Sequence, residues 1–255
     1  MELLLIQPRF PISFGDGQGH PAVRARPGAD LAKAIRGMGL TTGVPTIVPV
    51  TAGSRPGDLQ RLVPLLEKVV VPVAEALDAT VVDEGTRGGM AGLLATARAR
   101  KKAGFPLLGV APDGAGGAGP DPATLDPEYS HFVLVPAYER GVLARWVAAV
   151  ATAVAGGNRS VALVAAGGEP AWDSVTAHVA AGRLVMAVAR SGGVADRLAA
   201  ALRGGTSEPR ATSLAASGQV CAVDPGRGAS FVADSLRSAL SRPDALPAGP
   251  SPAGR

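Results

Sequence analysis

The chain has 255 residues, of which 47% are apolar and 18% charged, and its formal net charge is +4. This length and apolar content exclude a disulfide-stapled miniprotein and a wholly disordered chain, and they suit one large domain or two small ones. The single cysteine, Cys221, excludes an internal disulfide and a cysteine-based zinc site, so we expect a reducing, cytoplasmic setting.

The chain begins with a segment that predicts little regular structure. An acidic residue stands where a secretory leader has basic ones, so no export signal is expected. We expect residues 1–28 to be an irregular lead-in and residues 29–38 a short amphipathic helix, which makes 1–40 an N-terminal extension. Residues 41–240 are expected to form the main domain, and the Pro-, Ala- and Gly-rich residues 241–255 a disordered tail.

Short β-branched, apolar runs alternate with stretches of helical periodicity along the main domain. The runs are apolar on both faces, as strands covered by helices on each side are. The sequence therefore predicts an α/β fold with a mostly parallel sheet. The predicted strands are residues 45–51, 79–83, 106–110, 131–135, 160–166, 184–189 and 219–223. The predicted helices are residues 58–77, which Pro64 and Pro72 should bend or break, 89–103, 140–155, 170–181, 194–202 and 228–240.

Two stretches bear on the class of partner. The apolar residues 142–155 contain Arg145 and are too few to span a bilayer, so we expect a partly buried helix of a soluble protein. The only dense basic run, residues 98–102, has no interleaved aromatic residues and is typical of an exposed helix end. We therefore expect neither nucleic acid nor membrane as a partner.

Four of the predicted strands end in turns of small residues. The carboxyl ends of parallel strands meet at one edge of the sheet, which is where open α/β sheets bind ligands. Glycine also serves simply to turn a chain tightly, so the prediction of a phosphate-containing ligand depends on the four turns together. The candidate binding residues are Thr51, Ala52, Gly53, Ser54 and Arg55; Glu84, Gly85, Thr86, Arg87, Gly88, Gly89 and Met90; Gly167, Gly168 and Glu169; and Ser191, Gly192 and Gly193.

The second of these turns is our first choice for the phosphate site. Thr86 adds a hydroxyl group and Arg87 a cation, and two glycines lead directly into a helix. Glu84 would repel a phosphate, so it either points away, contacts a ribose hydroxyl, or marks a changed or lost ligand. Tyr129 and Phe132, near the sheet edge, are the candidates for stacking on a base.

Several motifs occur in a fixed order between residues 46 and 202. They are Thr-Ala-Gly at 51–53, Gly-Thr-Arg-Gly-Gly-Met at 85–90, and the segments 106–112, 125–132, 161–168 and 191–196. Together they resemble the SLOG superfamily, in particular its prokaryotic branch related to the cytosolic N-terminal (LSDAT/SLOG) region of melastatin-type TRP channels. The resemblance implies a Rossmann-like three-layer sandwich that binds a nucleotide-derived molecule, such as ADP-ribose or an NAD-related compound. It implies a sensor more often than an enzyme, with no required cofactor.

The sequence departs from the family at Glu84, Ala52 and Ala166, which stand where glycines are common. It also lacks the glutamate that follows the glycine turn in the related nucleotide phosphoribohydrolases, whose motif is PGGxGTxxE. Asp83 and Glu84 are consecutive at a strand end, so we expect their side chains to face opposite sides rather than to form an acid–base pair.

Other chemistry-bearing residues give weaker signals. Ser130 and His131 are neighbours on a strand, which places them on opposite sides, and Cys221 lies in an apolar strand typical of a buried thiol. The histidines at 20, 131 and 178 are too far apart in sequence to indicate a metal site, and His178 is expected to be a surface or packing residue.

Ligand sensing without catalysis is therefore our first interpretation. The alternative is a hydrolase that acts on a nucleotide or its N-glycosidic bond, with Asp83 or Glu84 as the acid. A third is an interaction scaffold that has lost its ligand. A sensor with no fused effector would act through a second copy of itself or a separately encoded effector protein.

Overall fold

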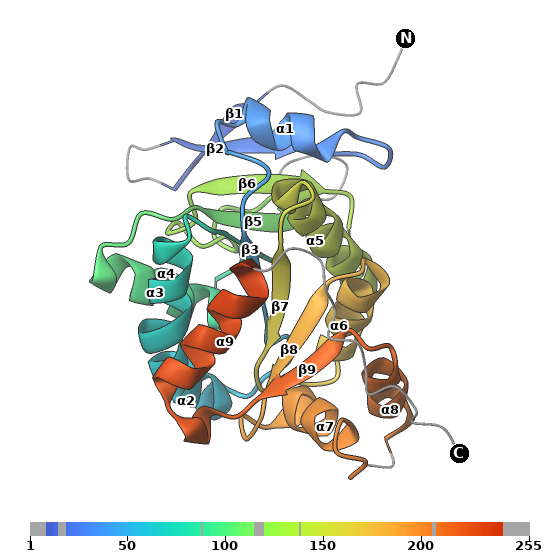
Figure 1. Cartoon of the computed structure of the whole chain (residues 1–255). Helices are drawn as coiled ribbons and strands as arrows, with labels where there is room; N and C mark the ends of the chain where they lie inside the picture. The colour runs from blue at the N-terminus through green and yellow to red at the C-terminus, as the bar shows by residue number, and fades with distance from the viewer. Residues whose placement is uncertain are drawn as a thin grey trace.

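The computed structural model describes residues 9–14, 19–87, 89–114, 120–137, 139–205 and 208–241. The chain forms a Rossmann-like three-layer sandwich with a nine-stranded sheet between two layers of helices (Figure 1). The strands are β1 (Phe10–Ser13), β2 (Gly19–Arg24), β3 (Thr46–Val50), β4 (Thr80–Asp83), β5 (Leu107–Pro112), β6 (His131–Val135), β7 (Ser160–Val164), β8 (Leu184–Val188) and β9 (Val220–Val223). The helices are α1 (Leu31–Gly37), α2 (Pro56–Leu65), α3 (Val71–Ala76), α4 (Gly89–Lys101), α5 (Arg140–Ala155), α6 (Ala171–Ala180), α7 (Gly193–Ala201), α8 (Pro209–Ala216) and α9 (Ala229–Ser241).

The sheet grows outward in both directions from β3. Its strand order is β1-β2-β6-β5-β4-β3-β7-β8-β9, and only β1 pairs antiparallel to its neighbour. β4, β5 and β6 extend the sheet on one side of β3, whereas β7, β8 and β9 extend it on the other. The direction of growth therefore reverses between β3 and β7, and such a reversal opens a crevice at the carboxyl ends of the strands. The predicted α/β, mostly parallel architecture is confirmed.

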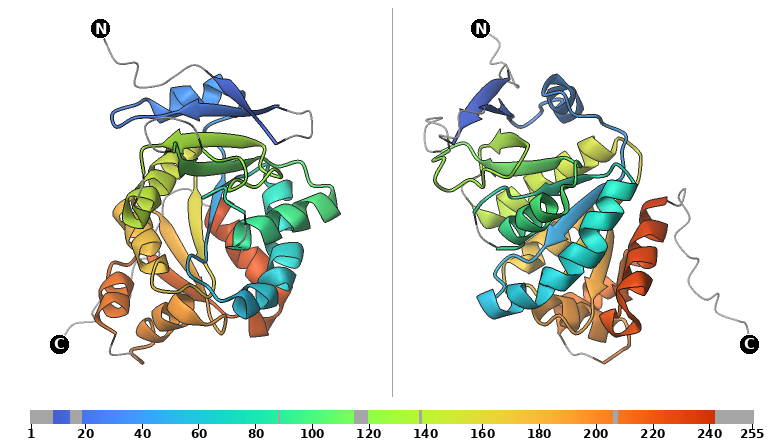
Figure 2. Two further views of the ribbon diagram at one scale, coloured as in Figure 1. Left: turned by 180° about the vertical axis from the view of Figure 1, so that it is seen from behind. Right: turned by 90° about the vertical axis from the view of Figure 1, so that its left-hand side faces the viewer.

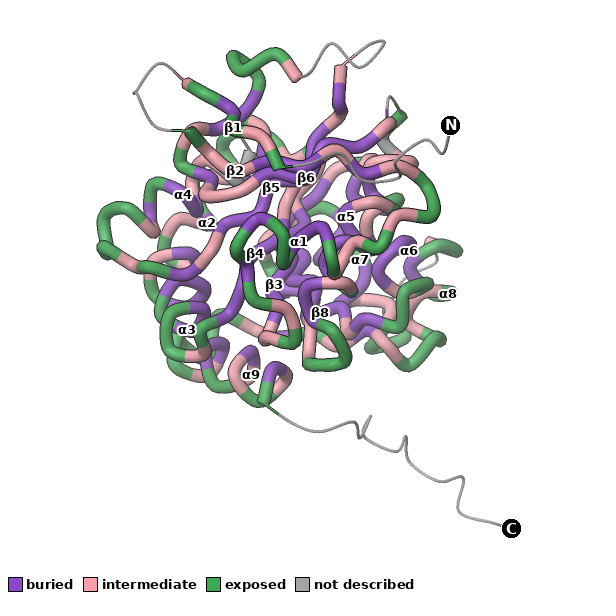
Figure 3. The backbone as a smooth tube through the Cα atoms, turned by 90° about the horizontal axis from the view of Figure 1, so that it is seen from above, coloured by how far each residue is buried: buried purple, intermediate pink, exposed green. Residues whose placement is uncertain are grey.

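Helices cover both faces because the central strands are apolar on both. Every residue of β3 is buried, and successive side chains pack into different layers. Ile47 packs in the core formed with α2, α3, α4 and α9, and Val48 in the core formed with α1 and α5. Figure 1 shows the first group on one side of the sheet and α5, α6 and α8 on the other. Buried residues follow the strands and the inner faces of these helices (Figure 3).

The helix predicted at residues 58–77 is interrupted, as its prolines indicated. A π-helical segment, η1 (Leu66–Val70), separates α2 from α3. Pro72 has no N–H to donate, and the N–H of Val71 bonds the carbonyl of Leu66, five residues back, in place of the usual four. The prolines therefore widen one turn without ending the helical path.

The irregular lead-in predicted for residues 1–28 is wrong where the structure describes it. β1 and β2 form an antiparallel pair, and β2 continues the sheet in parallel with β6, placing Ala22 opposite Phe132. Figure 2 shows this pair in blue at the edge of the sheet, beside α1. Pro11 and Pro21 interrupt the strand pattern in the sequence. Proline is tolerated at Pro11 because β1 is an edge strand, and Pro21 precedes the residues of β2 that pair with β6.

Two arginines tie this edge to the main sheet. Nε of Arg24 lies 2.6 Å from Oδ1 of Asp113, and a guanidinium nitrogen of Arg26 lies 3.2 Å from Oδ2. Asp113 follows β5 and is buried, with 1% of its side chain exposed. A buried carboxylate requires such partners, so these ion pairs fix β2 against the rest of the sheet.

The far end of the chain differs from the prediction in one element. α8, between β8 and β9, was not predicted; it has only 8 residues, of which Ala211 alone is buried. The predicted tail lies outside the described residues beyond Ser241. None of the described helices is long and apolar enough to cross a membrane.

Candidate functional site

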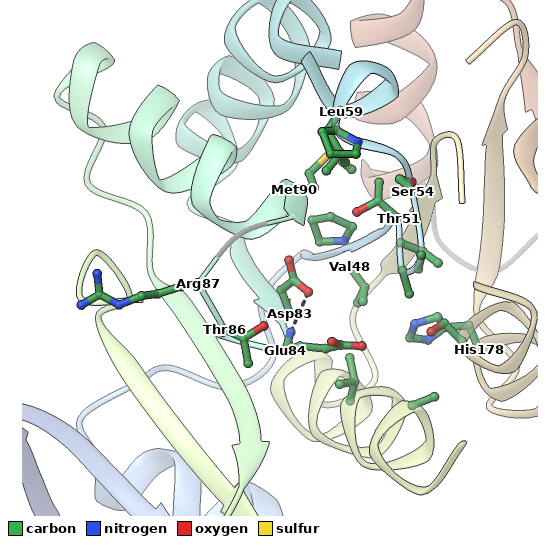
Figure 4. Close-up of a pocket in the computed structure, with 18 residues that line it drawn as sticks. Val48, Thr51, Ser54, Leu59, Asp83, Glu84, Thr86, Arg87, Met90 and His178 are labelled. Atoms are coloured by element: carbon green, nitrogen blue, oxygen red, sulfur yellow. Dashed lines mark hydrogen bonds between the residues drawn. The ribbon is translucent and has the colours of Figure 1, made fainter. Parts of the chain in front are cut away.

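A cavity of about 350 Å³ lies at the carboxyl ends of β3 and β4, beside the reversal point of the sheet (Figure 4). Its walls come from β3 and the turn after it, the turn after β4, the first residues of α2 and α4, and one face each of α5 and α6. Its lining residues are Val48, Pro49, Val50, Thr51, Ala52, Gly53, Ser54, Pro56, Leu59, Asp83, Glu84, Thr86, Arg87, Met90, Ala144, Val147, Ser174 and His178.

Two of the four predicted glycine turns meet at this cavity. The turn after β3 contributes residues 51–54, and the turn after β4 contributes Glu84, Thr86, Arg87 and Met90. α2 and α4 begin at these turns, so the N-terminal ends of two helices, which carry partial positive charge, lie at the cavity; in α2 the first residue, Pro56, has no N–H, and the next is Gly57. Gly85 and Gly89 belong to the same segment, and Gly88 lies outside the described residues.

The third turn packs against the first and does not contribute to the cavity wall. The N–H of Gly168 donates to the carbonyl of Ala52 at 2.9 Å, and the N–H of Gly167 donates to the hydroxyl of Ser54 at 2.9 Å. A β-carbon on Gly168 would overlap the carbonyl oxygen of Gly53. These two amides are therefore engaged inside the protein, and glycine is required by the contact between the turns.

The fourth turn is packed behind the third in the same way. The hydroxyl of Ser191 accepts the N–H of Ala166 at 2.8 Å, and the N–H of Val194, the second residue of α7, donates to the carbonyl of Gly167 at 2.9 Å. Gly193 has φ +55°, and a β-carbon there would overlap the same carbonyl oxygen. Gly192 is the N-cap residue of α7. The described geometry brings this turn to the third turn and away from the cavity wall.

Two charged residues predicted in the site also lie off the cavity wall. Arg55 is exposed at the start of α2, and its carbonyl accepts the N–H groups of Asp58 and Leu59. Glu169 is exposed and forms a two-pronged ion pair with Arg210 of α8, whose hydrogen bonds lower the pKa of Glu169. The charge of Glu169 is thus directed to a neighbouring helix.

The side chain of Arg87 is directed away from the cavity. Its Nε donates to the carbonyl of Leu125 at 2.9 Å, its backbone N–H donates to the carbonyl of Thr124, and Figure 4 shows it extending to the side opposite His178. The carbonyl of Gly85 accepts the N–H of Asp126. The second turn is therefore held by the 124–126 segment.

Asp83 and Glu84, here called the acidic pair, both line the cavity, and Figure 4 shows their carboxylates pointing in different directions, that of Asp83 toward Met90 and that of Glu84 toward His178. β4 ends at Asp83, and Glu84 is the next residue, so the two directions follow the alternation of a strand. Oδ1 of Asp83 accepts the N–H of Glu84 at 2.6 Å, and the hydroxyl of Tyr129 donates to Oδ2 at 3.4 Å.

The acidic pair has an unusual proton affinity. Burial, and then the charge of Glu84, raise the pKa of Asp83 to about 7, although the hydrogen bonds from Glu84 and Tyr129 lower it. Near neutral pH this carboxyl group is therefore present in both protonation states. A group with such a pKa in a cavity is suited to donating or accepting protons.

The predicted base-stacking role of Tyr129 and Phe132 is wrong. Both side chains are fully buried, and their rings pack against each other with centroids 6.1 Å apart. Burial raises the pKa of Tyr129 well above its ordinary value. These aromatic residues belong to the core beneath the cavity.

His178 is a cavity residue that sequence reasoning missed. It lies on α6 with 1% of its surface exposed, and its ring reaches the cavity wall (Figure 4). Its Nδ1 is 2.6 Å from a guanidinium nitrogen of Arg183. The available signal was its spacing from Ser174, since residues four apart share a helix face and both line the cavity.

The remaining chemistry-bearing residues lie elsewhere. The hydroxyl of Ser130 bonds the backbone of Leu107 at the amino ends of β5 and β6, and burial raises the pKa of Cys221 in β9 to about 11. Within the described ranges, no group of three His, Cys, Asp or Glu side chains is placed to hold a metal ion.

The family model described as "SLOG in TRPM, prokaryote" (LSDAT_prok) matches residues 44–233, which span β3 to β9 and the whole cavity. The chain belongs to this SLOG family. The resemblance inferred from the motifs is confirmed, and the match leaves β1, β2 and α1 outside. An X-ray structure of TM1055, a target of the Northeast Structural Genomics Consortium, is 17% identical, with a TM-score of 0.50, and the alignment covers 76% of this chain and 98% of that one. It shows a shared fold. No curated protein matches the chain.

Two departures from the SLOG glycines lie at the contact between turns. The carbonyl of Ala52 accepts the N–H of Gly168, and this hydrogen bond does not involve the alanine side chain. Ala166 adopts φ +54°, a left-handed conformation that is easier for glycine. This SLOG domain thus keeps the backbone geometry of a glycine turn with an alanine in place.

Proposed function

We propose that this SLOG protein binds a nucleotide-derived small molecule, of the ADP-ribose or NAD-related class, in the cavity at the ends of β3 and β4, and that it acts as a sensor. One observation carries the proposal: a single cavity at the reversal point receives the amide ends of α2 and α4 together with the acidic pair. Helix amide ends attract phosphate, and carboxylates accept hydrogen bonds from ribose hydroxyls. A nucleotide carries both groups.

The phosphate site in this proposal includes fewer turns than the sequence indicated. The amides of Gly167 and Gly168 already have partners in the protein, so the ligand would meet the first and second turns. The hydroxyl-bearing residues Thr51, Ser54 and Thr86 line the cavity beside the helix ends. The third and fourth turns would support the first turn from behind.

Ligand-induced stabilisation tests the binding. The full chain is melted and titrated with NAD, ADP-ribose, AMP and adenosine, and we expect the phosphate-bearing compounds to stabilise it more than adenosine. A ligand at one hundred times its dissociation constant adds about 2.7 kcal/mol to the free energy of unfolding. Thr86→Val should weaken binding, whereas Thr212→Val on α8, outside the cavity wall, should not. If none of the compounds stabilises the wild-type chain, the scaffold interpretation replaces this one.

The pKa of Asp83 favours a second candidate, hydrolysis of an N-glycosidic bond. Protonated Asp83 would give its proton to the departing base as the bond between base and anomeric carbon breaks, while Glu84 takes a proton from the water that attacks that carbon. Chromatography of NAD, ADP-ribose and AMP after incubation would detect released base or nicotinamide. If the wild-type chain releases base and the variants Glu84→Gln and Asp83→Asn do not, the protein is an enzyme. If the compounds remain intact, the sensor interpretation stands.

A further inference from the structure

Behind the cavity lies a buried cation with an unusual set of partners. Arg183 is 3% exposed and has no carboxylate partner among the residues that the structure describes. Its Nε donates to the hydroxyl of Ser160 at 2.9 Å. One terminal nitrogen donates to the carbonyl of Ala148 at 3.1 Å and to the hydroxyl of Thr152 at 2.9 Å, and the other donates to Nδ1 of His178 at 2.6 Å.

This arrangement fixes the proton position on His178. A guanidinium group has only donors, so Nδ1 of His178 must accept and the proton of the neutral ring must be on Nε2. Burial, and then the charge of Arg183, lower the pKa of His178 to about 3, which keeps the ring neutral near pH 7. Burial lowers the pKa of Arg183 only to about 10, so the guanidinium stays charged.

On its cavity side, His178 faces an acceptor. Figure 4 shows the carboxylate of Glu84 extending across the cavity toward the imidazole ring. Ser174, one helical turn before His178, lines the same wall. A ligand group between an N–H donor and a carboxylate must both accept and donate. A hydroxyl group does both, whereas a phosphate only accepts and would meet the like charge of Glu84.

We propose that His178 and Glu84 bind the ribose hydroxyls of the ligand, and that Arg183 is the positioning residue that holds His178 as an Nε2–H donor. This proposal rests on the proposed nucleotide binding and specifies how the nucleotide is oriented in the cavity. The ribose lies toward α6, and the ends of α2 and α4 remain for the phosphate.

The first experiment needs no ligand. Nitrogen–proton correlation NMR reads the tautomer of each imidazole ring, and the chain has 3 histidines to assign. The expected result is an Nε2–H tautomer for His178 that persists well below pH 6. Arg183→Met should produce mixed tautomers and a higher pKa for His178. An Nδ1–H or mixed tautomer in the wild-type chain overturns the role of Arg183, even if the Arg183 variant does not fold.

The second experiment measures hydroxyl discrimination by calorimetry with AMP, ADP and their 2′-deoxy and 3′-deoxy analogues. The wild-type chain should bind the ribonucleotide about tenfold more tightly than at least one deoxy analogue. His178→Phe keeps the ring volume and removes the donor, so it should lose that preference. His178→Gln, whose amide N–H reaches a similar point, should keep part of it, and the control Thr212→Val all of it. This ratio of affinities does not depend on the folded fraction.

The outcomes separate this proposal from the one on which it rests. Nucleotide binding without a preference for ribose, or with a preference that survives in His178→Phe, overturns the ribose subsite and leaves nucleotide binding in place. Failure of the wild-type chain to bind any of the nucleotides overturns both. Loss of the preference in His178→Phe alone supports the subsite.

Discussion

The carboxyl edge of the sheet carries two kinds of glycine turn. After β3 and β4 the turns border a cavity together with the acidic pair and two helix ends. After β7 and β8 the turns are equally rich in glycine, but amides of the turn after β7 bond Ala52, Ser54 and Ser191, and a β-carbon on Gly168 or Gly193 would overlap a neighbouring carbonyl oxygen. Glycine after a strand therefore serves packing as readily as ligand binding. The partners of the amides distinguish the two uses.

The contact between the turn after β7 and the turn after β3 should be sensitive to added volume. Gly168→Ala is expected to lower the free energy of unfolding by about 3 kcal/mol, because the new β-carbon overlaps the carbonyl of Gly53. Gly57→Ala, in α2 with no atom within 4 Å of the added carbon, is the matched control and should gain up to about 1 kcal/mol. Urea denaturation measures both. Equal stability of the two variants would contradict the packing described between the turns.

One hydroxyl group from each kind of turn should show opposite effects on stability and on nucleotide binding. Ser191→Ala removes the acceptor of the Ala166 amide and should cost about 1–3 kcal/mol of stability, with nucleotide affinity unchanged. Thr86→Val, at the cavity, should change stability by less than about 0.5 kcal/mol and weaken nucleotide binding. Denaturation and calorimetry on both variants measure the two effects. If Ser191→Ala weakens nucleotide binding and Thr86→Val does not, the ligand binds at the turns after β7 and β8 and not at those after β3 and β4.

The titratable residues at the cavity should also make the stability of the protein depend on pH. Between pH 4 and 7 the folded chain keeps a proton on Asp83 that the unfolded chain has released, so this group makes stability fall as pH rises, by about 1 kcal/mol per pH unit. His178 acts oppositely between pH 3 and 6.5, where only the unfolded chain holds its proton. These two slopes offset each other, and His131, whose pKa burial lowers to about 4, adds a further rise in stability up to about pH 6.5. In Asp83→Asn, denaturation at several pH values should show stability that rises up to pH 6.5 and stays level to pH 7.5. If stability depends on pH in this variant as it does in the wild-type chain, the raised pKa of Asp83 is contradicted.

The smallest effect is expected at Glu169. Its carboxylate is exposed and bonds Arg210, away from the cavity wall. Glu169→Gln should therefore leave nucleotide affinity unchanged in a calorimetric titration, whereas Glu84→Gln should alter it. A clear loss of affinity in Glu169→Gln would bring the third turn into the binding site.

The sequence predicted the layered fold because apolar runs with both faces buried have few other solutions. It failed at β1 and β2, where Pro11 and Pro21 disturb the pattern and the pairing partner, β6, is more than one hundred residues away. Periodicity is a local signal, whereas an edge strand is defined by its distant neighbour. α8 was missed because it is short, with 8 residues and one buried position, Ala211.

The site was predictable in position but not in composition. Topology alone places a crevice at the ends of β3 and β7, and the cavity lies beside it, between the turns at 51–54 and 84–90 that follow β3 and β4. Which amides remain available depends on contacts such as Gly168 with Ala52, which residue type does not encode. The contact of His178 with Arg183, five residues later and beyond the end of α6, depends on the path of that turn, which residue type does not encode.

The family match begins at residue 44, yet the sheet does not end there. A fragment cut at that boundary would expose the β6 backbone that now pairs with β2, and would strip Asp113 of both its arginines. An open, apolar strand edge recruits strands from other molecules. The segment that the family model matches is therefore shorter than the sheet, and we expect a chain truncated at residue 44 to aggregate more readily than the full chain.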